Sequence, residues 1–173
     1  MKLIINTKNG FSLIEIIVVM LLVGVMAALA GVGYVQVVRG MLFTKMNAAT
    51  IQKGELAMTR LVKEFNNMRI SSVTTADATS ITFGFVKVDV VTNLPVTSSR
   101  TVEFTGGSTI TYDGVDILTD QVSEFGLKYY DNYDTDGQTT WQSSRRIIEI
   151  TLKLKGADDV ISEFKARVKP RNS

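Results

Sequence analysis

An apolar run near the N-terminus constrains the fold of this chain more than any other feature. From Phe11 to Val38 the run contains a single charged side chain, Glu15. A run of this length with so little charge is typical of a helix that spans a membrane. At about 1.5 Å per residue the helix would be roughly 42 Å long, whereas the hydrocarbon core of a bilayer is about 30 Å thick. We therefore predict one transmembrane helix that emerges on the far side of the membrane.

Glu15 has two interpretations, because a carboxylate within a membrane-spanning helix is costly unless it is paired, neutralised or close to an interface. In the first interpretation it is a functional residue. In the second it lies in the first turn, near the lipid headgroups and the positive end of the helix dipole. Its position in the sequence does not separate the two.

The N-terminal residues resemble a known processing signal. Lys8-Asn9-Gly10-Phe11-Ser12-Leu13-Ile14-Glu15 and the apolar residues that follow look like the class III signal peptide of type IV pilins and type II secretion pseudopilins. In that family a prepilin peptidase cuts after the glycine, the new N-terminal phenylalanine is N-methylated, and the glutamate aligns each subunit with its neighbour. The resemblance implies that Gly10 is the cleavage residue, Phe11 the methylated terminus and Glu15 the assembly carboxylate.

The same resemblance implies the partners and the location of the chain. The partners would be other pilin or pseudopilin subunits, prepilin peptidase, an inner-membrane assembly platform and, before assembly, membrane lipid. Tyr129-Tyr130-Asp131 followed by Trp141 is similar to the C-terminal part of minor pilins and minor pseudopilins, which favours a minor subunit. Lys2 and Lys8 favour a cytoplasmic leader. We expect a single-pass protein of the inner membrane whose C-terminal domain is periplasmic or extracellular, and which then enters a filament.

Two alternatives compete with this interpretation. Ala28-Leu29-Ala30 resembles the cleavage site of an ordinary signal peptidase, which would release a periplasmic binding module after Ala30. The apolar segment before that site is longer than the usual 7 to 15 residues, and apolar residues continue beyond it. The second alternative is a membrane-anchored enzyme or sensor that keeps its leader. The identity of the mature N-terminal residue separates the three.

The chain divides into four segments, which predict an α+β fold. Residues 1–10 form a leader that is removed, and residues 11–38 form the transmembrane or assembly helix. Residues 39–70 continue this helix as an amphipathic segment, with Met58, Leu61 and Phe65 at helical spacing. Residues 71–173 form a globular domain with an antiparallel β-sheet packed against the helix. Gly40 and Gly54 each weaken a continuous helix by up to about 1 kcal/mol relative to alanine.

Alternating apolar residues predict the strands of the globular domain. Residues 71–80 are rich in serine and threonine and predict a loop. The alternation changes face from Phe85 to Val86, beside Gly84, so we predict a β-bulge at Gly84. The C-terminus predicts a hairpin with a buried row that packs on the amphipathic half of the helix. That row consists of Ile148, Ile150, Leu152 and Leu154 before the turn, and Val160, Phe164, Ala166 and Val168 after it.

Residues suited to catalysis or ligand binding are few. The chain has no His and no Cys, which removes the commonest general base and thiol nucleophile, so we expect no enzyme activity. Asn132, Asp134 and Asp136 match the opening of a calcium loop, but Ser143 occupies the position of the bidentate Glu. We favour an Asx-rich turn there, and no cofactor.

Basic side chains follow the outward face of the predicted C-terminal hairpin. These residues are Lys153, Lys155, Lys165, Arg167, Lys169 and Arg171. Such a stripe could contact phosphates, but Glu149 and Glu163 interrupt it and it lacks aromatic stacking partners. We favour a solvated face or a subunit contact over nucleic-acid binding. Removal of Lys2 and Lys8 would leave 17 basic and 17 acidic side chains, so bulk charge gives no reason to expect a nucleic-acid partner.

Overall fold

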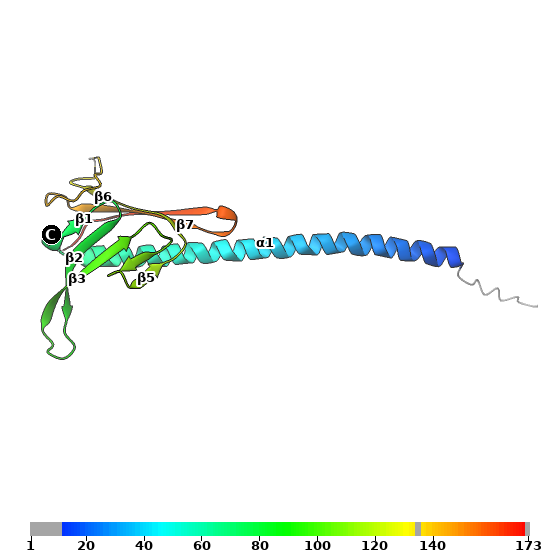
Figure 1. The fold of residues 1–173 in the computed structure, drawn as a ribbon, viewed down its shortest axis with the longest axis horizontal. Coiled ribbons are helices and arrows are strands. Elements are labelled where there is room, and N and C mark those ends of the chain that lie inside the picture. The colour runs from blue at the N-terminus through cyan, green and yellow to red at the C-terminus, as the bar shows by residue number, and fades with distance from the viewer. Residues whose placement is uncertain (1–11, 134–135, 172–173) are drawn as a thin grey trace, which may run out of the picture. The chain divides into compact units, whose positions relative to one another are not determined.

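A long helix and two antiparallel sheets make up the described part of the chain, residues 12–133 and 136–171 of the computed structural model (Figure 1). This arrangement confirms the predicted α+β fold. Gly10, Phe11 and Asp134 lie outside the described residues. The chain divides into two compact units, one that ends at Thr44 and one that begins at Lys45.

The helix α1 (Leu13–Asn67) contributes to both units and is long and apolar enough to cross a membrane. It runs without interruption through Gly40 and Gly54, and it ends one residue before Met68, where the sequence predicted its end. The side chains of residues 13–37 are all exposed. From Thr50 onward one face of α1 becomes buried, and none of residues 39–49 is buried. The buried residues are Thr50, Gly54, Ala57, Met58, Leu61 and Phe65.

The first sheet has the strand order β1-β2-β3-β4-β5. Its strands are β1 (Thr75–Ala76), β2 (Ser80–Val88), β3 (Pro95–Phe104), β4 (Ile110–Tyr112) and β5 (Asp116–Thr119). The predicted loop over residues 71–80 is only partly correct, because it includes β1 and overlaps the short helix η1 (Ile70–Ser72). The turn between β4 and β5 has Asp113 and Gly114 at positive φ, as expected of an Asp-Gly hairpin turn.

The predicted bulge at Gly84 is wrong. The pairing of β2 with β3 is continuous, and Gly84 lies opposite Ser99. Gly84 is instead a site of close approach, since an added Cβ would lie 2.9 Å from Cβ of Ser72. The amide N–H of Gly84 donates to Oγ of Ser72 at 2.9 Å. The change of face in the sequence arises because Val86 and Val88 lie beyond the core and are exposed.

The second sheet has the strand order β6-β7-β8. Its strands are β6 (Val122–Tyr130), β7 (Ile147–Lys155) and β8 (Ile161–Val168), and the short helix η2 (Ala157–Asp159) joins the last two. The C-terminal hairpin is confirmed, and Ile148, Ile150, Leu152 and Leu154 are fully buried. The inclusion of Val160 in the buried row is wrong, because it precedes β8 and is 40% exposed.

One hydrophobic cluster joins the C-terminal part of α1 to both sheets. The ring of Phe65 on α1 meets that of Phe83 on β2 edge to face, with centroids 5.7 Å apart. Phe164 of β8 packs against the helix at Gly54. The predicted packing of the hairpin on the amphipathic half of the helix is therefore confirmed.

Candidate functional site

The first turn of α1 contains Glu15, the candidate assembly residue. The carbonyl of Ser12 accepts hydrogen bonds from the amides of Glu15 and Ile16, at 3.0 and 3.3 Å. Ser12 therefore occupies the N-cap position and Glu15 the third helical position, where the helix dipole favours a negative charge. The spacing Ser12-x-x-Glu15 is that of a capping box, a sequence signal for this helix N-terminus that the transmembrane prediction did not use.

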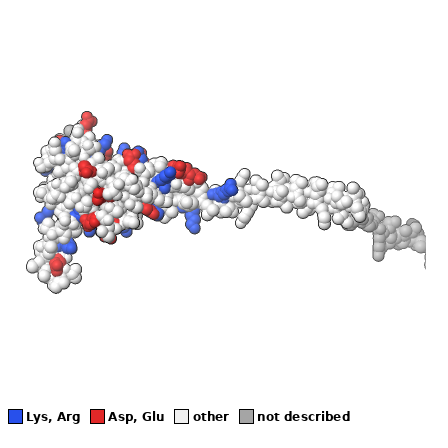
Figure 2. Space-filling model, viewed as in Figure 1, with Lys and Arg blue, Asp and Glu red and all other residues white. Residues whose placement is uncertain are grey.

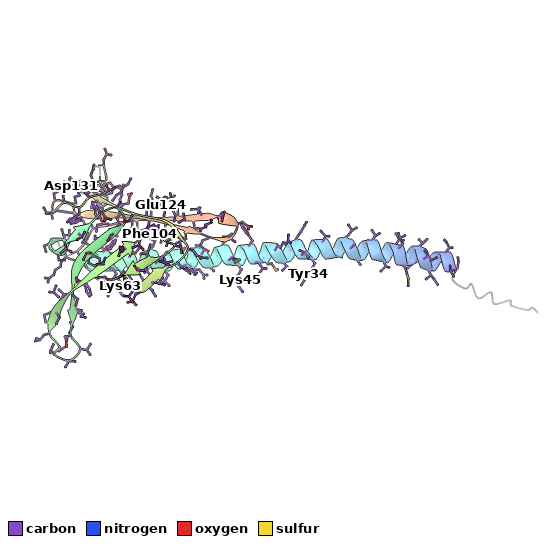
Figure 3. All side chains as sticks on the ribbon, viewed as in Figure 1. Tyr34, Lys45, Lys63, Phe104, Glu124 and Asp131 are labelled. Carbon is purple, nitrogen blue, oxygen red and sulfur yellow. The ribbon has the colours of Figure 1, made fainter. Side chains whose placement is uncertain are left out.

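The surface of α1 up to Val38 is apolar on all sides, apart from Glu15 and Gln36. Leu13, Met20 and Met26 are each more than two-thirds exposed. Tyr34 projects outward from the helix (Figure 3), and Figure 2 shows this stretch almost free of charged side chains. An exposed apolar surface of this extent requires lipid or protein to cover it.

Small residues form a shallow groove on the same part of α1. The groove is lined by Ala27, Ala28, Gly31, Val32, Val35, Gln36 and Arg39. An added Cβ at Gly24 or Gly31 would have nothing within 4 Å, so neither glycine is needed for contacts within the chain. Small residues at helical spacing let a second helix approach closely.

The candidate calcium residues belong to the segment after β6. Asp131 accepts a hydrogen bond from Oγ of Ser144 at 3.0 Å, and Asp136 is exposed. Asn132 is engaged in an interaction of its own. No group of three acidic, His or Cys side chains suited to a metal occurs among the described residues, which exclude Asp134.

The basic stripe of the C-terminal hairpin is largely neutralised by carboxylates. Lys153 and Arg167 each lie 2.6 Å from an acid, Glu124 and Glu149 respectively. Lys155 pairs with Asp159 at 2.8 Å, and Lys165 lies 3.4 Å from Glu163. Figure 2 shows the blue and red side chains interspersed over this domain. Such a surface has little excess positive charge to offer a phosphate backbone.

The pair of Glu149 and Arg167 also joins the segment after β6 to the sheet. Burial opposes ionisation of Glu149, yet the hydrogen bond and charge of Arg167 hold its pKa below the usual value. The guanidinium stacks 4.6 Å from the ring centroid of Tyr130 and donates to the carbonyl of Tyr133 at 3.3 Å. Arg167 is thus a structural residue.

Comparison with known families identifies the N-terminal segment. The family model described as the prokaryotic N-terminal methylation motif matches residues 5–31. The match includes Gly10, Phe11 and Glu15 and extends into the small-residue groove at Gly31. No curated protein and no solved structure matches the chain.

The chain therefore carries a class III signal like that of type IV pilins and pseudopilins. The motif supports a structural subunit of a pilus or pseudopilus. A motif of this kind generally implies assembly with other pilin-type subunits and recognition by a prepilin peptidase. The apolar helix is consistent with membrane anchoring.

Proposed function

We propose that this chain is a minor subunit of a type IV pilus or a type II secretion pseudopilus, processed after Gly10 and assembled through α1. The observation that carries this proposal is the coincidence of two features. The methylation motif covers residues 5–31, and the helix in which it ends exposes an apolar surface over residues 13–37. A helix of this kind is stable in lipid before assembly and in a bundle of like helices afterwards.

Assembly transfers α1 from lipid to protein surroundings. The groove around Ala27, Ala28 and Gly31 supports this step, because it lets a neighbouring helix approach closely. Lipid tails are as apolar as the helix surface, so close packing and polar pairing, and not the hydrophobic effect, have to favour the bundle.

Glu15 supplies the polar pairing in this proposal. Its carboxylate in the first turn of α1 is costly within a helix bundle unless a cation lies beside it. Cleavage after Gly10 creates an amine at Phe11. The amine of one subunit next to Glu15 of another satisfies both charges at a single axial offset, which sets the register of the filament.

In this proposal the chain resides in the inner membrane before assembly, and the unit from Lys45 onward lies in the periplasm. The leader, with Lys2 and Lys8, stays on the cytoplasmic side until the peptidase removes it.

The mass of the mature N-terminal peptide tests the proposal. Full-length protein is isolated from membranes of cells with and without the prepilin peptidase. We expect methylated Phe11 in the first sample and an intact leader in the second. A terminus at Gly31 in both samples would show ordinary signal peptidase cleavage after Ala30. A terminus at Met1 in both samples would show that the leader is kept.

A further inference from the structure

The strand β8 forms a free edge of the second sheet. It is the last strand in the order β6-β7-β8, and it pairs with β7 without a break or a proline from Ile161 to Val168. The opposite edge is covered, because the amides of Val122, Leu127 and Tyr129 on β6 donate to carbonyls outside the sheet at 2.7 to 2.9 Å. No such bond covers β8 among the backbone hydrogen bonds of the described residues. A long, regular edge of this kind can accept another strand.

The hydrogen bonds of the C-terminal hairpin identify the backbone groups on this free edge. The amide of Gly156 donates across the turn to the carbonyl of Val160 at 2.8 Å. The amide of Lys155 points the other way and donates to the carbonyl of Gln121 at 2.8 Å. Bonded and non-bonded pairs alternate in an antiparallel ladder, so the even-numbered residues of β7 bond to β8. The register then leaves the N–H and C=O groups of four β8 residues facing outward: Ile161, Glu163, Lys165 and Arg167.

A groove lies beside this edge, between β8 and the part of α1 from Lys45 onward. The two elements run alongside each other (Figure 1): Phe164 packs at Gly54, and the amide of Arg171 donates to the carbonyl of Asn66 at 3.2 Å. We call this space the β8 groove, and its volume is about 560 Å³. Its lining residues are Glu55, Met58 and Thr59 of α1 and Glu163, Phe164, Lys165 and Ala166 of β8.

We propose that an extended segment of a different pilin-type subunit binds in the β8 groove and adds to β8 as a fourth strand of the second sheet. Its backbone would pair with the outward N–H and C=O groups of β8, and its alternate side chains would pack on Met58, Phe164 and Ala166. Met58 is buried and the other two are partly buried, so these three form an apolar floor.

The chemistry of the edge and the proposed function select this occupant. Lipid is a poor occupant, because it offers no row of backbone donors and acceptors to an open strand edge. Another polypeptide in extended conformation offers that row. A minor subunit is flanked in its filament by subunits of other kinds, so the segment comes from a different chain. The inference thus rests on the proposed function.

Unpaired charges at the two ends of the β8 groove favour one direction for the added strand. Glu55 lies at the end nearer the start of β8, and Lys169 and Arg171 follow the end of β8. None of these three belongs to an ion pair of the described residues. We expect the segment to run antiparallel to β8, as the neighbouring strands of this sheet do. An acidic residue near its N-terminal end would then meet Lys169, and a basic residue near its C-terminal end would meet Glu55.

Photo-cross-linking in assembled filaments tests the contact. The photoreactive residue p-benzoylphenylalanine replaces Thr59 in the full-length chain, and the products are recovered with an antibody against this chain. We expect a product with another subunit that carries the methylation motif, cross-linked within a segment of alternating apolar residues. The same replacement at Arg60 is the matched control, because successive residues of a helix point about 100° apart. Its yield of this product should be at least about fivefold lower.

Proline substitution tests whether the backbone of β8 makes the contact. Lys165→Pro removes an N–H that points away from β7, which an edge strand tolerates. Lys165→Ala removes the same side chain and keeps the N–H. We expect the first to lower the cross-linked yield about fivefold or more and the second to leave it within about twofold. Glu163→Pro, with Glu163→Ala as its control, is the second pair if the melting temperature shows that Lys165→Pro does not fold.

Several outcomes would overturn the added strand. A product between two copies of this chain, with none to another subunit, would show that two β8 edges pair with each other. Equal products from positions 59 and 60 would show that the segment has no defined seat. Full yield in folded proline variants would show a contact through side chains alone.

Charge reversal tests the direction of the added strand. Lys169→Glu should lower the yield about threefold, whereas Lys128→Glu on β6, at the far edge of the sheet, should leave it unchanged. Equal effects of the two substitutions would reject this direction.

N-terminal mass analysis of the same filaments keeps the two proposals distinct. Methylated Phe11 in chains that enter filaments but give no product at position 59 rejects only the added strand. A terminus at Met1 or Gly31, with no chain in filaments, rejects the proposed function as well.

Discussion

Gly54 of α1 lies directly against the phenyl ring of Phe164 on β8. A Cβ at position 54 would overlap ring atoms of Phe164. The absence of a side chain at Gly54 thus lets the edge strand of the second sheet approach the helix closely. A glycine inside a helix costs about 0.5 to 1 kcal/mol relative to alanine, and the contact with Phe164 explains why alanine would not be an improvement here.

Gly54→Ala should lower the free energy of unfolding by about 1 to 3 kcal/mol, because overpacking outweighs the gain in helix propensity. Thermal or denaturant unfolding of the full-length protein in detergent measures the change. Gly40→Ala is the control, since a Cβ there meets nothing within 4 Å; it should leave stability unchanged or raise it by up to about 1 kcal/mol. Equal effects of the two substitutions would show that the contact with Phe164 does not constrain position 54.

Two tyrosines of the core should respond in opposite ways to removal of their hydroxyl groups. The hydroxyl of Tyr112 is buried without a hydrogen-bond partner among the described residues. That of Tyr129 donates to the carbonyl of Asp77 at 2.9 Å. Tyr112→Phe should raise the free energy of unfolding by about 1 kcal/mol, whereas Tyr129→Phe should lower it by a similar amount. Denaturant unfolding of the two variants under identical conditions measures both, and a loss of stability in Tyr112→Phe would contradict the unpaired hydroxyl.

The raised pKa of Tyr112 predicts a loss of stability in alkaline solution. Burial, and then the charge of Glu64, raise the pKa of Tyr112 from 10.0 to about 12. A phenol whose pKa is raised by folding stabilises the protein fully below pH 10, and this contribution is lost as the pH rises from 10 to 12. Tyr112→Phe should therefore reduce the decline in melting temperature over that interval. An unchanged pH profile would show that Tyr112 titrates normally in the folded protein.

Sequence periodicity predicted the elements whose side chains alternate regularly between core and solvent. In β7, apolar and polar residues alternate from Ile148 to Leu154, and the apolar ones are fully buried. The length and apolar character of α1 were likewise sufficient to predict its course. Periodicity failed at Gly84, because it assumes that apolar residues face a core. Val86 and Val88 of β2 face water instead.

The candidate site was predictable to the extent that it is a linear motif. The spacing of Gly10, Phe11 and Glu15 can be recognised without any structure, and the matched family model covers the same residues. The surface lined by Leu56 and Ile117 was not predictable, because these two residues are far apart in sequence and only the fold brings them together. Likewise, the spacing of the basic residues along the hairpin does not predict which acids on neighbouring strands, such as Glu124 and Glu149, pair with them.

Acid should weaken the link between Glu149 and Arg167. The pKa of Glu149 is held below its usual value, so the stabilisation is present above pH 4.5 and is lost as the pH falls through the lowered pKa. Glu149→Gln should cost about 1 kcal/mol at pH 7, and the difference from the wild type should close at low pH. Melting temperatures at pH 7 and pH 3 measure this, with Glu163→Gln as an exposed control. A difference that persists at pH 3 would show that the charge of Glu149 is not responsible.

Glu15 gives the sharpest separation of processing from assembly. The peptidase acts between Gly10 and Phe11, whereas Glu15 lies in the first turn of the helix and meets its proposed partner only in the filament. Glu15→Ala should therefore leave methylated Phe11 unchanged but reduce the fraction of chains in sheared filaments about tenfold, which corresponds to about 1.4 kcal/mol. Glu15→Gln keeps the shape and removes the charge, so an equal loss in both variants assigns the effect to the carboxylate. Mass analysis of the N-terminal peptide and quantification of sheared filaments provide the two readouts. Normal incorporation of either variant would remove Glu15 from the assembly mechanism and leave it as a residue favoured only by the helix dipole.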